Sequence, residues 1–149
     1  MSDFATTNPG YAEQVAAMFA QQTFMQTIGA RIARLEPGLA EIELPYRRDL
    51  TQQHGYFHGG VTSAIADNAG GAAAYTLFPA GSAILTVEFK INLLAPAAGE
   101  KLVAVGLVLK PGRTLSVTDL KVYAVAGETR TLCASGQQTL IRLDRPTPS

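Results

Sequence analysis

The most constraining feature of this sequence is a run of small side chains that follows a pair of glycines. Between Gly59 and Leu77 the residues are mostly alanine, glycine or serine. This run predicts a helix that begins at His58-Gly59-Gly60 and extends toward Phe78-Pro79. Each glycine inside a helix costs roughly 1 kcal/mol relative to alanine. Small side chains offset that cost by letting neighbouring elements approach closely, so we expect a central helix wrapped tightly by the rest of the fold.

Strand patterns surround this helix on both sides in the sequence. Apolar residues from Ile28 to Leu44 alternate around Pro37-Gly38, which predicts a β-hairpin. Four more strand-like segments follow the helix, broken by Pro96, by Pro111-Gly112 and by Gly127-Glu128. They span about 83–93, 100–110, 113–126 and 128–140. We therefore expect an α+β fold in which a curved antiparallel sheet wraps one long helix.

The two ends of the chain have different patterns. From Tyr11 the positions Val15, Met18, Phe19 and Phe24 have helical spacing, which predicts an additional N-terminal helix. The last residues are polar and rich in proline, which favours a frayed tail. We expect an N-terminal segment over 1–25, one domain over 26–141 and a flexible tail over 142–149.

Composition narrows the classes of partner and compartment. The 149 residues contain 12 Lys+Arg and 12 Asp+Glu, so no overall field attracts nucleic acid or an anionic membrane. The single Cys133 lies in an apolar setting typical of a buried small residue and excludes an intramolecular disulfide. The first residues lack a basic signal-peptide start, and no apolar run has the length of a membrane span. We expect a cytoplasmic protein without nucleic-acid or membrane partners.

The start of the small-residue helix is a candidate anion site. Gly59 and Gly60 would expose unpaired backbone N–H groups at the positive end of the helix dipole, where an oxyanion can bind. A tight turn before a helix is the commoner use of two glycines. Asp67 is a carboxylate in an otherwise nearly uncharged helix, and a solvated surface residue is the usual alternative.

The spacing of the two features has a consequence for assembly. Asp67 follows Gly59 by eight residues, which separates them by roughly 12 Å along a helix. One substrate carbonyl cannot contact both. If they cooperate, the Asp67 that acts on a substrate comes from a second copy of the chain, so the site implies a dimer.

Five segments resemble the hotdog thioesterases of the PaaI type and their 4-hydroxybenzoyl-CoA thioesterase relatives, over about 27–140. The segments are Gln52-Gln53-His54-Gly55-Tyr56-Phe57-His58-Gly59-Gly60, Ala66-Asp67-Asn68, Thr86-Val87-Glu88-Phe89, Leu94-Ala95-Pro96-Ala97 and Lys110-Pro111-Gly112-Arg113-Thr114. The resemblance implies the hotdog fold and hydrolysis of an acyl-CoA thioester. It also implies a homodimer at minimum, and we expect a homotetramer.

By this resemblance, the Gly59 N–H is the oxyanion-hole donor and Asp67 is the nucleophile or the general base for water. Gln52 would position the thioester or the attacking water. His58 would hold the loop and the sulfur side of the site, or make an orienting hydrogen bond within the turn. Thr86 matches a hydroxyl residue that contacts the carboxylate or the water, although threonine is also an ordinary strand residue.

Further residues would bind the CoA part of the substrate. Gly60 would lie beside the thioester, while Lys110, Gly112 and Arg113 resemble an edge that holds phosphate or pantetheine. Exposed cations at a turn also serve solubility. The resemblance implies neither a metal nor an organic cofactor, because coenzyme A is part of the substrate. The two histidines have no partners at metal-site spacing.

Two other functions fit the same fold. A hotdog hydratase or dehydratase acts on an acyl thioester with a histidine and an acid, but its dehydratase loop carries extra prolines that are absent here. A non-catalytic module that binds acyl-CoA would lack a competent carboxylate, and Asp67 speaks against it. Gln52 and Asp67 together mix features of two thioesterase subfamilies, so the acyl group stays open.

Overall fold

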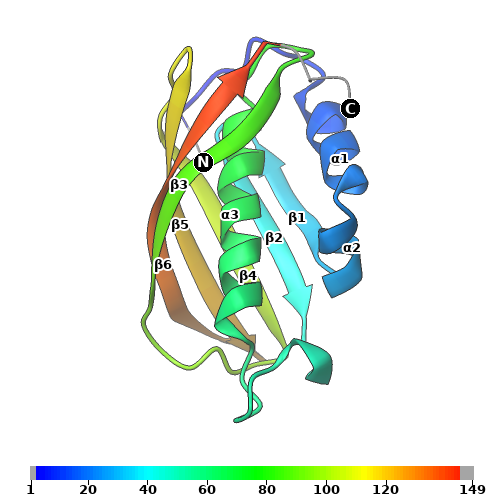
Figure 1. The fold of residues 1–149 in the computed structure, drawn as a ribbon, viewed down its shortest axis with the longest axis vertical. Coiled ribbons are helices and arrows are strands. Elements are labelled where there is room, and N and C mark those ends of the chain that lie inside the picture. The colour runs from blue at the N-terminus through cyan, green and yellow to red at the C-terminus, as the bar shows by residue number, and fades with distance from the viewer. Residues whose placement is uncertain (1–2, 145–149) are drawn as a thin grey trace.

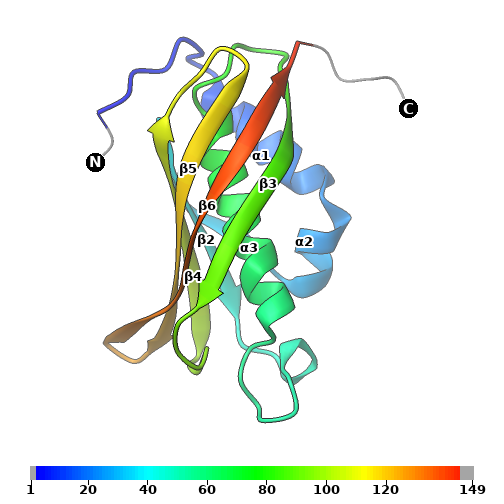
Figure 2. The same ribbon diagram turned by 60° about the vertical axis from the view of Figure 1, so that its left-hand side comes forward.

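One long helix lies in the hollow of one curved sheet (Figure 1). The structure is a computed structural model that describes residues 3–144. The central helix α3 spans Gly59–Tyr75, within the segment that the run of small residues predicts. Figure 2 shows α3 between the sheet and a pair of N-terminal helices. This confirms the expected hotdog architecture.

All six strands pair antiparallel, in the order β1-β2-β4-β5-β6-β3. Their bounds are Arg31–Glu36 (β1), Leu39–Pro45 (β2), Ala83–Leu93 (β3), Lys101–Lys110 (β4), Leu115–Ala126 (β5) and Thr129–Leu143 (β6). Strand β3 pairs with β6 rather than with its sequence neighbour β4. Both β1 and β3 are therefore edges of the sheet within one chain.

The small residues of α3 let its backbone touch the sheet. A Cβ atom on Gly106 of β4 would overlap the Ala69 carbonyl and the Gly70 nitrogen of the helix. These are backbone atoms, which cannot swing aside as a flexible side chain can. Only a glycine on the strand permits this contact. The close approach inferred from the helix sequence therefore also needs a strand residue without a side chain.

The core forms where this helix meets the inner face of the sheet. Ile65 and Ala66 of α3 are completely buried. They pack in one cluster with aliphatic side chains from three strands, the fully buried Ile42, Leu44, Leu102, Leu120 and Val122. Burial of each such aliphatic side chain contributes about 1.5–3 kcal/mol, which fixes the position of the helix.

The N-terminal prediction of one helix is wrong in detail. Helix α1 spans Tyr11–Gln21, and a separate α2 spans Thr23–Ile28. Gln22 has an extended backbone between them, and its side chain accepts a hydrogen bond from the Asn68 Nδ2 of α3 at 2.5 Å. Phe24 is 54% exposed instead of packing at a helical core position. A contact with a distant helix thus accompanies the break in local periodicity.

Two strand limits also differ from the sequence pattern. Ile28 ends α2 instead of starting a strand, because Gly29 takes a left-handed φ of 80° there. A 3-10 turn, η1, spans Arg48–Leu50 in the loop before α3. Strand β6 continues to Leu143, beyond the expected limit, because Leu143 pairs with Ala83 on β3. The expected tail therefore begins with strand residues, and 145–149 lie outside the described residues.

Cys133 is buried, as its apolar setting predicts. Its Sγ donates a hydrogen bond to the Val122 carbonyl at 3.3 Å. Burial raises the pKa of this thiol, which favours the uncharged form. Within residues 3–144, no helix has both the length and the apolar character that crossing a membrane requires.

Substitution of Gly106 by alanine tests the close contact of α3 with β4. The added methyl group would overlap helix backbone, so we expect Gly106→Ala to lower the free energy of unfolding by about 1–3 kcal/mol. Urea denaturation followed by circular dichroism measures this change. An unchanged transition midpoint would show that the helix does not lie this close to the strand.

A pH-dependent prediction concerns Glu43 on β2. A hydrogen bond from Lys101 (2.5 Å), joined by Arg31 (2.9 Å), lowers the pKa of the Glu43 carboxyl. A lowered folded-state pKa stabilises the fold above the unfolded value, and this contribution disappears as pH falls through the folded value. We expect Lys101→Met to reduce the free energy of unfolding at pH 7 by up to about 1 kcal/mol.

This difference between wild type and Lys101→Met should shrink as the pH falls below about 4. Urea titrations at a series of pH values measure it. Lys121→Met is the matched control, because Lys121 pairs with Asp119 at a longer 3.4 Å, and we expect a smaller effect. A stability difference that is constant with pH would rule out the ion pair as its cause.

Candidate active site

The first turn of α3 leaves two backbone N–H groups, those of Gly59 and Val61, without a hydrogen bond within residues 3–144. His58 caps the helix, and its Nδ1 accepts a hydrogen bond from the Gly60 N–H at 2.8 Å. Neutral His58 therefore carries its proton on Nε2. Of the two residues with free N–H groups, Gly59 is the one that lines the cavity described next, so its free N–H faces that space at the positive end of the helix. The orienting role considered for His58 is seen directly, whereas the Gly60 amide is already engaged.

A cavity of about 610 Å³ opens beside the Gly59 amide. It brings together Gln52, His58 and Gly59, three of the residues that the sequence singles out. Gln52 Oε1 accepts a hydrogen bond from the His54 N–H at 2.5 Å, which ties its side chain to the loop. The other lining residues come largely from this loop and from the segment after β3: Gln53, Tyr56, Phe57, Thr62, Leu93, Leu94, Ala95, Pro96, Ala97 and Cys133.

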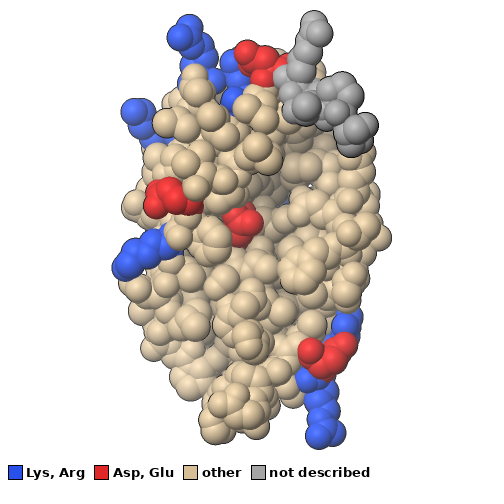
Figure 3. Space-filling model, in the orientation of Figure 1, with Lys and Arg blue, Asp and Glu red and all other residues tan. Residues whose placement is uncertain are grey.

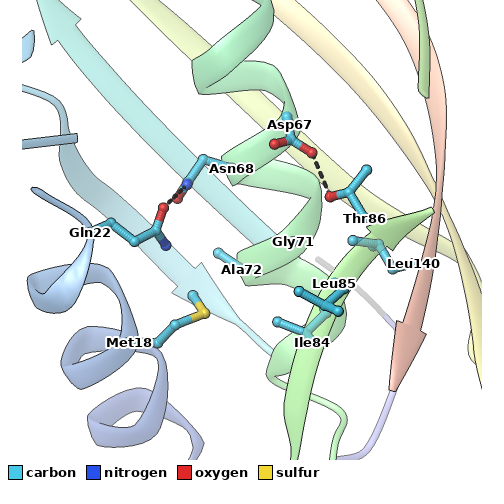
Figure 4. A pocket seen from close by; sticks show the side chains of 10 residues that line it. All are labelled: Met18, Gln22, Asp67, Asn68, Gly71, Ala72, Ile84, Leu85, Thr86 and Leu140. Carbon is cyan, nitrogen blue, oxygen red and sulfur yellow. Dashed lines mark hydrogen bonds between the residues drawn. The ribbon is translucent and has the colours of Figure 1, made fainter. Parts of the chain in front are cut away.

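Asp67 lies in a different cavity of about 330 Å³, farther along α3 (Figure 4). Its carboxylate is half-buried, and Oδ1 accepts a hydrogen bond from the Thr86 hydroxyl of β3 at 2.7 Å. Thr86 thus contacts the carboxylate, as the resemblance implies. The two cavities share no lining residue, so one chain keeps Gly59 and Asp67 apart.

A β-bulge in β3 aims Thr86 at the helix. The pairing of β3 with β6 shifts between Thr86 and Glu88, which leaves Val87 as an extra residue. Thr86 pairs with Leu140, and Phe89 pairs with Gln138. The extra residue lets both Thr86 and Phe89 share the inner face of the sheet, although three positions separate them.

Sequence reasoning missed Gln138 on β6. Its side chain is completely buried, and its Nε2 donates hydrogen bonds to Asp67 Oδ1 and to the Thr86 Oγ1 at 3.0 Å. The one available signal was a glutamine on the inner face of a strand, since glutamine is seldom fully buried. Two glutamines are adjacent in the sequence, and only the structure shows that Gln137 faces outward while Gln138 faces inward.

The N-terminal helices also contribute to the Asp67 cavity. Met18 of α1 and Gln22 face α3 across this space, and Gln22 is joined to Asn68 as described above (Figure 4). The sequence placed these residues in a separate N-terminal segment. Their contact with α3 depends on how two distant helices pack, and no local pattern indicates it.

The predicted CoA-binding turn lies away from Gly59 within one chain. Lys110, Gly112 and Arg113 form the turn between β4 and β5, at the end of the molecule opposite η1 and the start of α3 (Figure 1). Lys110 and Arg113 are exposed. Gly112 is required there because a Cβ would overlap the Leu115 carbonyl. These three residues stay predicted ligands.

One face of the chain carries few charged side chains and is partly apolar. Figure 3 shows Lys, Arg, Asp and Glu mainly around the margin of the face that carries α3, with one acidic group near its middle. Edge strand β3 and the residue that follows it expose large apolar side chains: Leu85, Val87, Phe89, Leu93 and Leu94. Apolar side chains on an unpaired strand edge are typical of a surface that another chain covers.

No group of three or more His, Cys, Asp or Glu side chains that could hold a metal ion occurs in the described part of the chain. The residues that line the two cavities offer backbone amides, one carboxylate and neutral polar groups. These groups suit addition of water or a carboxylate to a polarised carbonyl.

Comparisons with known proteins identify the family of this chain. Residues 54–131 match the family described as the thioesterase superfamily. A crystal structure of a thioesterase family protein from Silicibacter pomeroyi is 46% identical, with a TM-score of 0.88 over 90% of this chain and 98% of that one. Human acyl-coenzyme A thioesterase 13 is 30% identical over 129 residues, which are 85% of this chain and 90% of the relative.

The E. coli PaaI protein, at 24% identity, has the same fold, with a TM-score of 0.79 over 89% of this chain and 94% of that one. The matched family segment contains the start of α3, Asp67 and Thr86. The prediction of a hotdog thioesterase is confirmed at the level of family, fold and reaction class. This chain belongs to the thioesterase superfamily and is a hotdog-fold thioester hydrolase.

Proposed function

We propose that this chain hydrolyses an acyl- or aryl-CoA thioester to the free acid and CoA at a site shared by two subunits. The Gly59 N–H of one subunit polarises the thioester carbonyl. Asp67 of the neighbouring subunit acts as nucleophile or as general base for water. The observation that carries this proposal is the separation of the free Gly59 amide and the half-buried Asp67 carboxylate into two cavities of one chain.

The Gly59 amide has the properties of an oxyanion donor. It is unpaired, it lies at the N-terminus of a helix of 17 residues, and it borders a cavity with both polar and apolar walls. The helix dipole adds partial positive charge there, and the donor is fixed before the substrate arrives. A developing negative charge on the thioester oxygen is stabilised more than the neutral ground state is.

The Asp67 carboxylate has one anchored and one available oxygen. Thr86 and Gln138 both donate to Oδ1, whereas Oδ2 has no hydrogen-bond partner within residues 3–144. Oδ2 can take a proton from water or attack the thioester carbon. As a nucleophile, Oδ2 would contact the thioester carbon directly, whereas as a general base it would leave room for one water between them. Neither route uses a metal or an organic cofactor.

A second subunit would unite the two cavities. The apolar edge of β3 is unpaired within one chain, and pairing of two such edges around a twofold axis would extend the sheet and bury these side chains. The two α3 helices would then lie side by side and antiparallel. Gly59 of each would approach Asp67 of the other, and a homotetramer is the expected pair of such dimers.

The same symmetry suits the anionic end of the substrate. The turn with Lys110 and Arg113 lies at the end of the chain away from Gly59 (Figure 1). A partner turned end for end carries its own turn toward the Gly59 cavity. Its two exposed cations could then bind the CoA phosphates, with Gly112 keeping the turn narrow.

Substitution of Asp67 tests its chemical role. We expect Asp67→Asn and Asp67→Ala to lower kcat by about 10²- to 10⁴-fold, because the proton acceptor or nucleophile is lost. Release of free thiol from a panel of acyl- and aryl-CoA thioesters measures the rate. Glu128→Gln, which removes an exposed carboxylate in the β5–β6 turn, is the control and should keep full activity. Wild-type rates in both Asp67 variants would exclude this role.

Complementation tests the shared site. Gly59→Pro removes the N–H while proline is tolerated in the first helical turn, and Gly59→Ala is the matched control that keeps the N–H. Both meet the flexible Leu93 side chain. Gly59→Pro and Asp67→Ala chains should each be inactive. Mixing them one to one with free exchange should restore about a quarter of wild-type activity. About half of the dimers are then mixed, and each mixed dimer has one of its two sites intact.

Mass spectrometry of tagged chains verifies that subunits have exchanged. If mixed dimers are present and thiol release stays at the level of the separate variants, the two groups do not act across the interface.

A further inference from the structure

We propose that Gln138 is a positioning residue of this site, which fixes the Asp67 carboxylate so that Oδ2 alone meets the substrate. The proposal rests on the function proposed for Asp67. Gln138 lies behind the carboxylate, on the sheet side, and does not line either cavity. It therefore acts through Asp67 rather than on the substrate.

The Gln138 amide is fully buried and is held by hydrogen bonds to the surrounding residues. The side chain has 0% exposure, and a buried amide without partners would be strongly unfavourable. Both ends are satisfied here. Oε1 accepts from the Thr118 hydroxyl of β5 at 3.1 Å, and Nε2 faces the Asp67 carboxylate and the Asp67 carbonyl, the latter at 3.1 Å.

The charge of Asp67 fixes the orientation of this amide. An ionised carboxylate only accepts hydrogen bonds, so the NH₂ end of Gln138 must point toward it. The same nitrogen lies 3.0 Å from the Thr86 hydroxyl oxygen, so one of its two hydrogens is shared between neighbouring acceptors, and the Thr86 hydrogen is directed at Asp67 Oδ1. Gln138 thus sets the direction of the Thr86 hydroxyl as well as contacting the carboxylate itself.

Both donors reach the same carboxylate oxygen. Thr86 and Gln138 come from β3 and β6 and converge on Oδ1, so rotation of the carboxylate about its Cβ–Cγ bond would break two hydrogen bonds. The bond from Gln138 to the Asp67 carbonyl also ties the helix backbone at this position. Oδ2 is left without a hydrogen-bond partner within residues 3–144, in a side chain that lines a cavity where water or a thioester could bind.

A glycine in the helix provides the space for this side chain. A Cβ on Gly70 would overlap Gln138 Oε1 and would lie 2.6 Å from Leu120 Cδ2 and 2.7 Å from Thr118 Oγ1. Glycine at a helix interior costs roughly 1 kcal/mol relative to alanine. Gly70 lies one turn after Asp67, and its missing side chain leaves room for the buried Gln138 amide beneath the carboxylate. This glycine therefore has a role in the site.

The test compares two glutamines that are adjacent on one strand. Gln138→Met keeps the length of the side chain and removes the amide. Gln137→Met makes the same change on the outer, exposed side of β6. We expect Gln138→Met to lower kcat by about 10- to 100-fold, because a carboxylate free to rotate is misplaced for most of the time. KM should change by less than about 3-fold, and Gln137→Met should match wild type.

Binding stoichiometry separates positioning from loss of structure. The probe is the ketone analogue of the fastest substrate, in which a methylene group separates the carbonyl from sulfur, so that it binds without hydrolysis. Calorimetry should count the same number of sites per chain in Gln138→Met as in wild type. A kcat within about 2-fold of wild type, or a loss of binding sites in proportion to the loss of kcat, would overturn the proposal.

Asp67→Asn measured in parallel keeps this test distinct from that of the proposed function. Loss of activity in Asp67→Asn together with full activity in Gln138→Met would contradict only the positioning role of Gln138. Full activity in Asp67→Asn would instead remove the catalytic role of the carboxylate, on which the positioning role depends.

Discussion

The backbone contact between α3 and β4 is the constraint on which the rest of this structure depends. Gly106 has no side chain, so the carbonyl of Ala69 can lie directly against the strand. This close contact fixes how deeply the helix sits in the sheet. It also requires small residues at this point of the helix, Ala69 and Gly70, because a larger side chain there would push the two elements apart.

This depth determines the surroundings of Asp67. At a greater distance from the sheet, the carboxylate would be solvated as an ordinary surface group. At the observed distance it lies within hydrogen-bonding reach of Thr86 and Gln138, one from each of two paired strands. The bulge between Thr86 and Glu88 adjusts the strand so that the hydroxyl points at the helix. Packing and chemistry are therefore set by the same contacts.

The position of Asp67 along α3 separates it from Gly59, so that a single chain holds two distinct cavities. A helix that starts at a free amide and carries its carboxylate two turns later cannot present both to one carbonyl. The chain instead leaves an apolar, unpaired edge at β3 beside this helix. A twofold partner across that edge would complete both cavities at once, which links the assembly of the protein to its hydrolysis of thioesters.

Several parts of this fold could be predicted because their signals are local. Glycines at 59 and 60, the run of small residues and the alternating strands predict the helix start and the sheet, and the resemblance to hotdog thioesterases adds Asp67 and Thr86. A helix start, a turn or a strand depends mainly on residues close in sequence, so these features can be read directly from the chain.

Other parts were decided only by the tertiary structure. The break at Gln22, the entry of Met18 into the Asp67 cavity and the burial of Gln138 each depend on an element distant in the sequence. Gln138 reaches Asp67 only because β6 pairs with β3 in one register and Gly70 leaves room above it. The sequence by itself determined which residues could do chemistry. The packing of helix on sheet decided which oxygen of Asp67 is free to do it, because hydrogen bonds across that contact hold the other one.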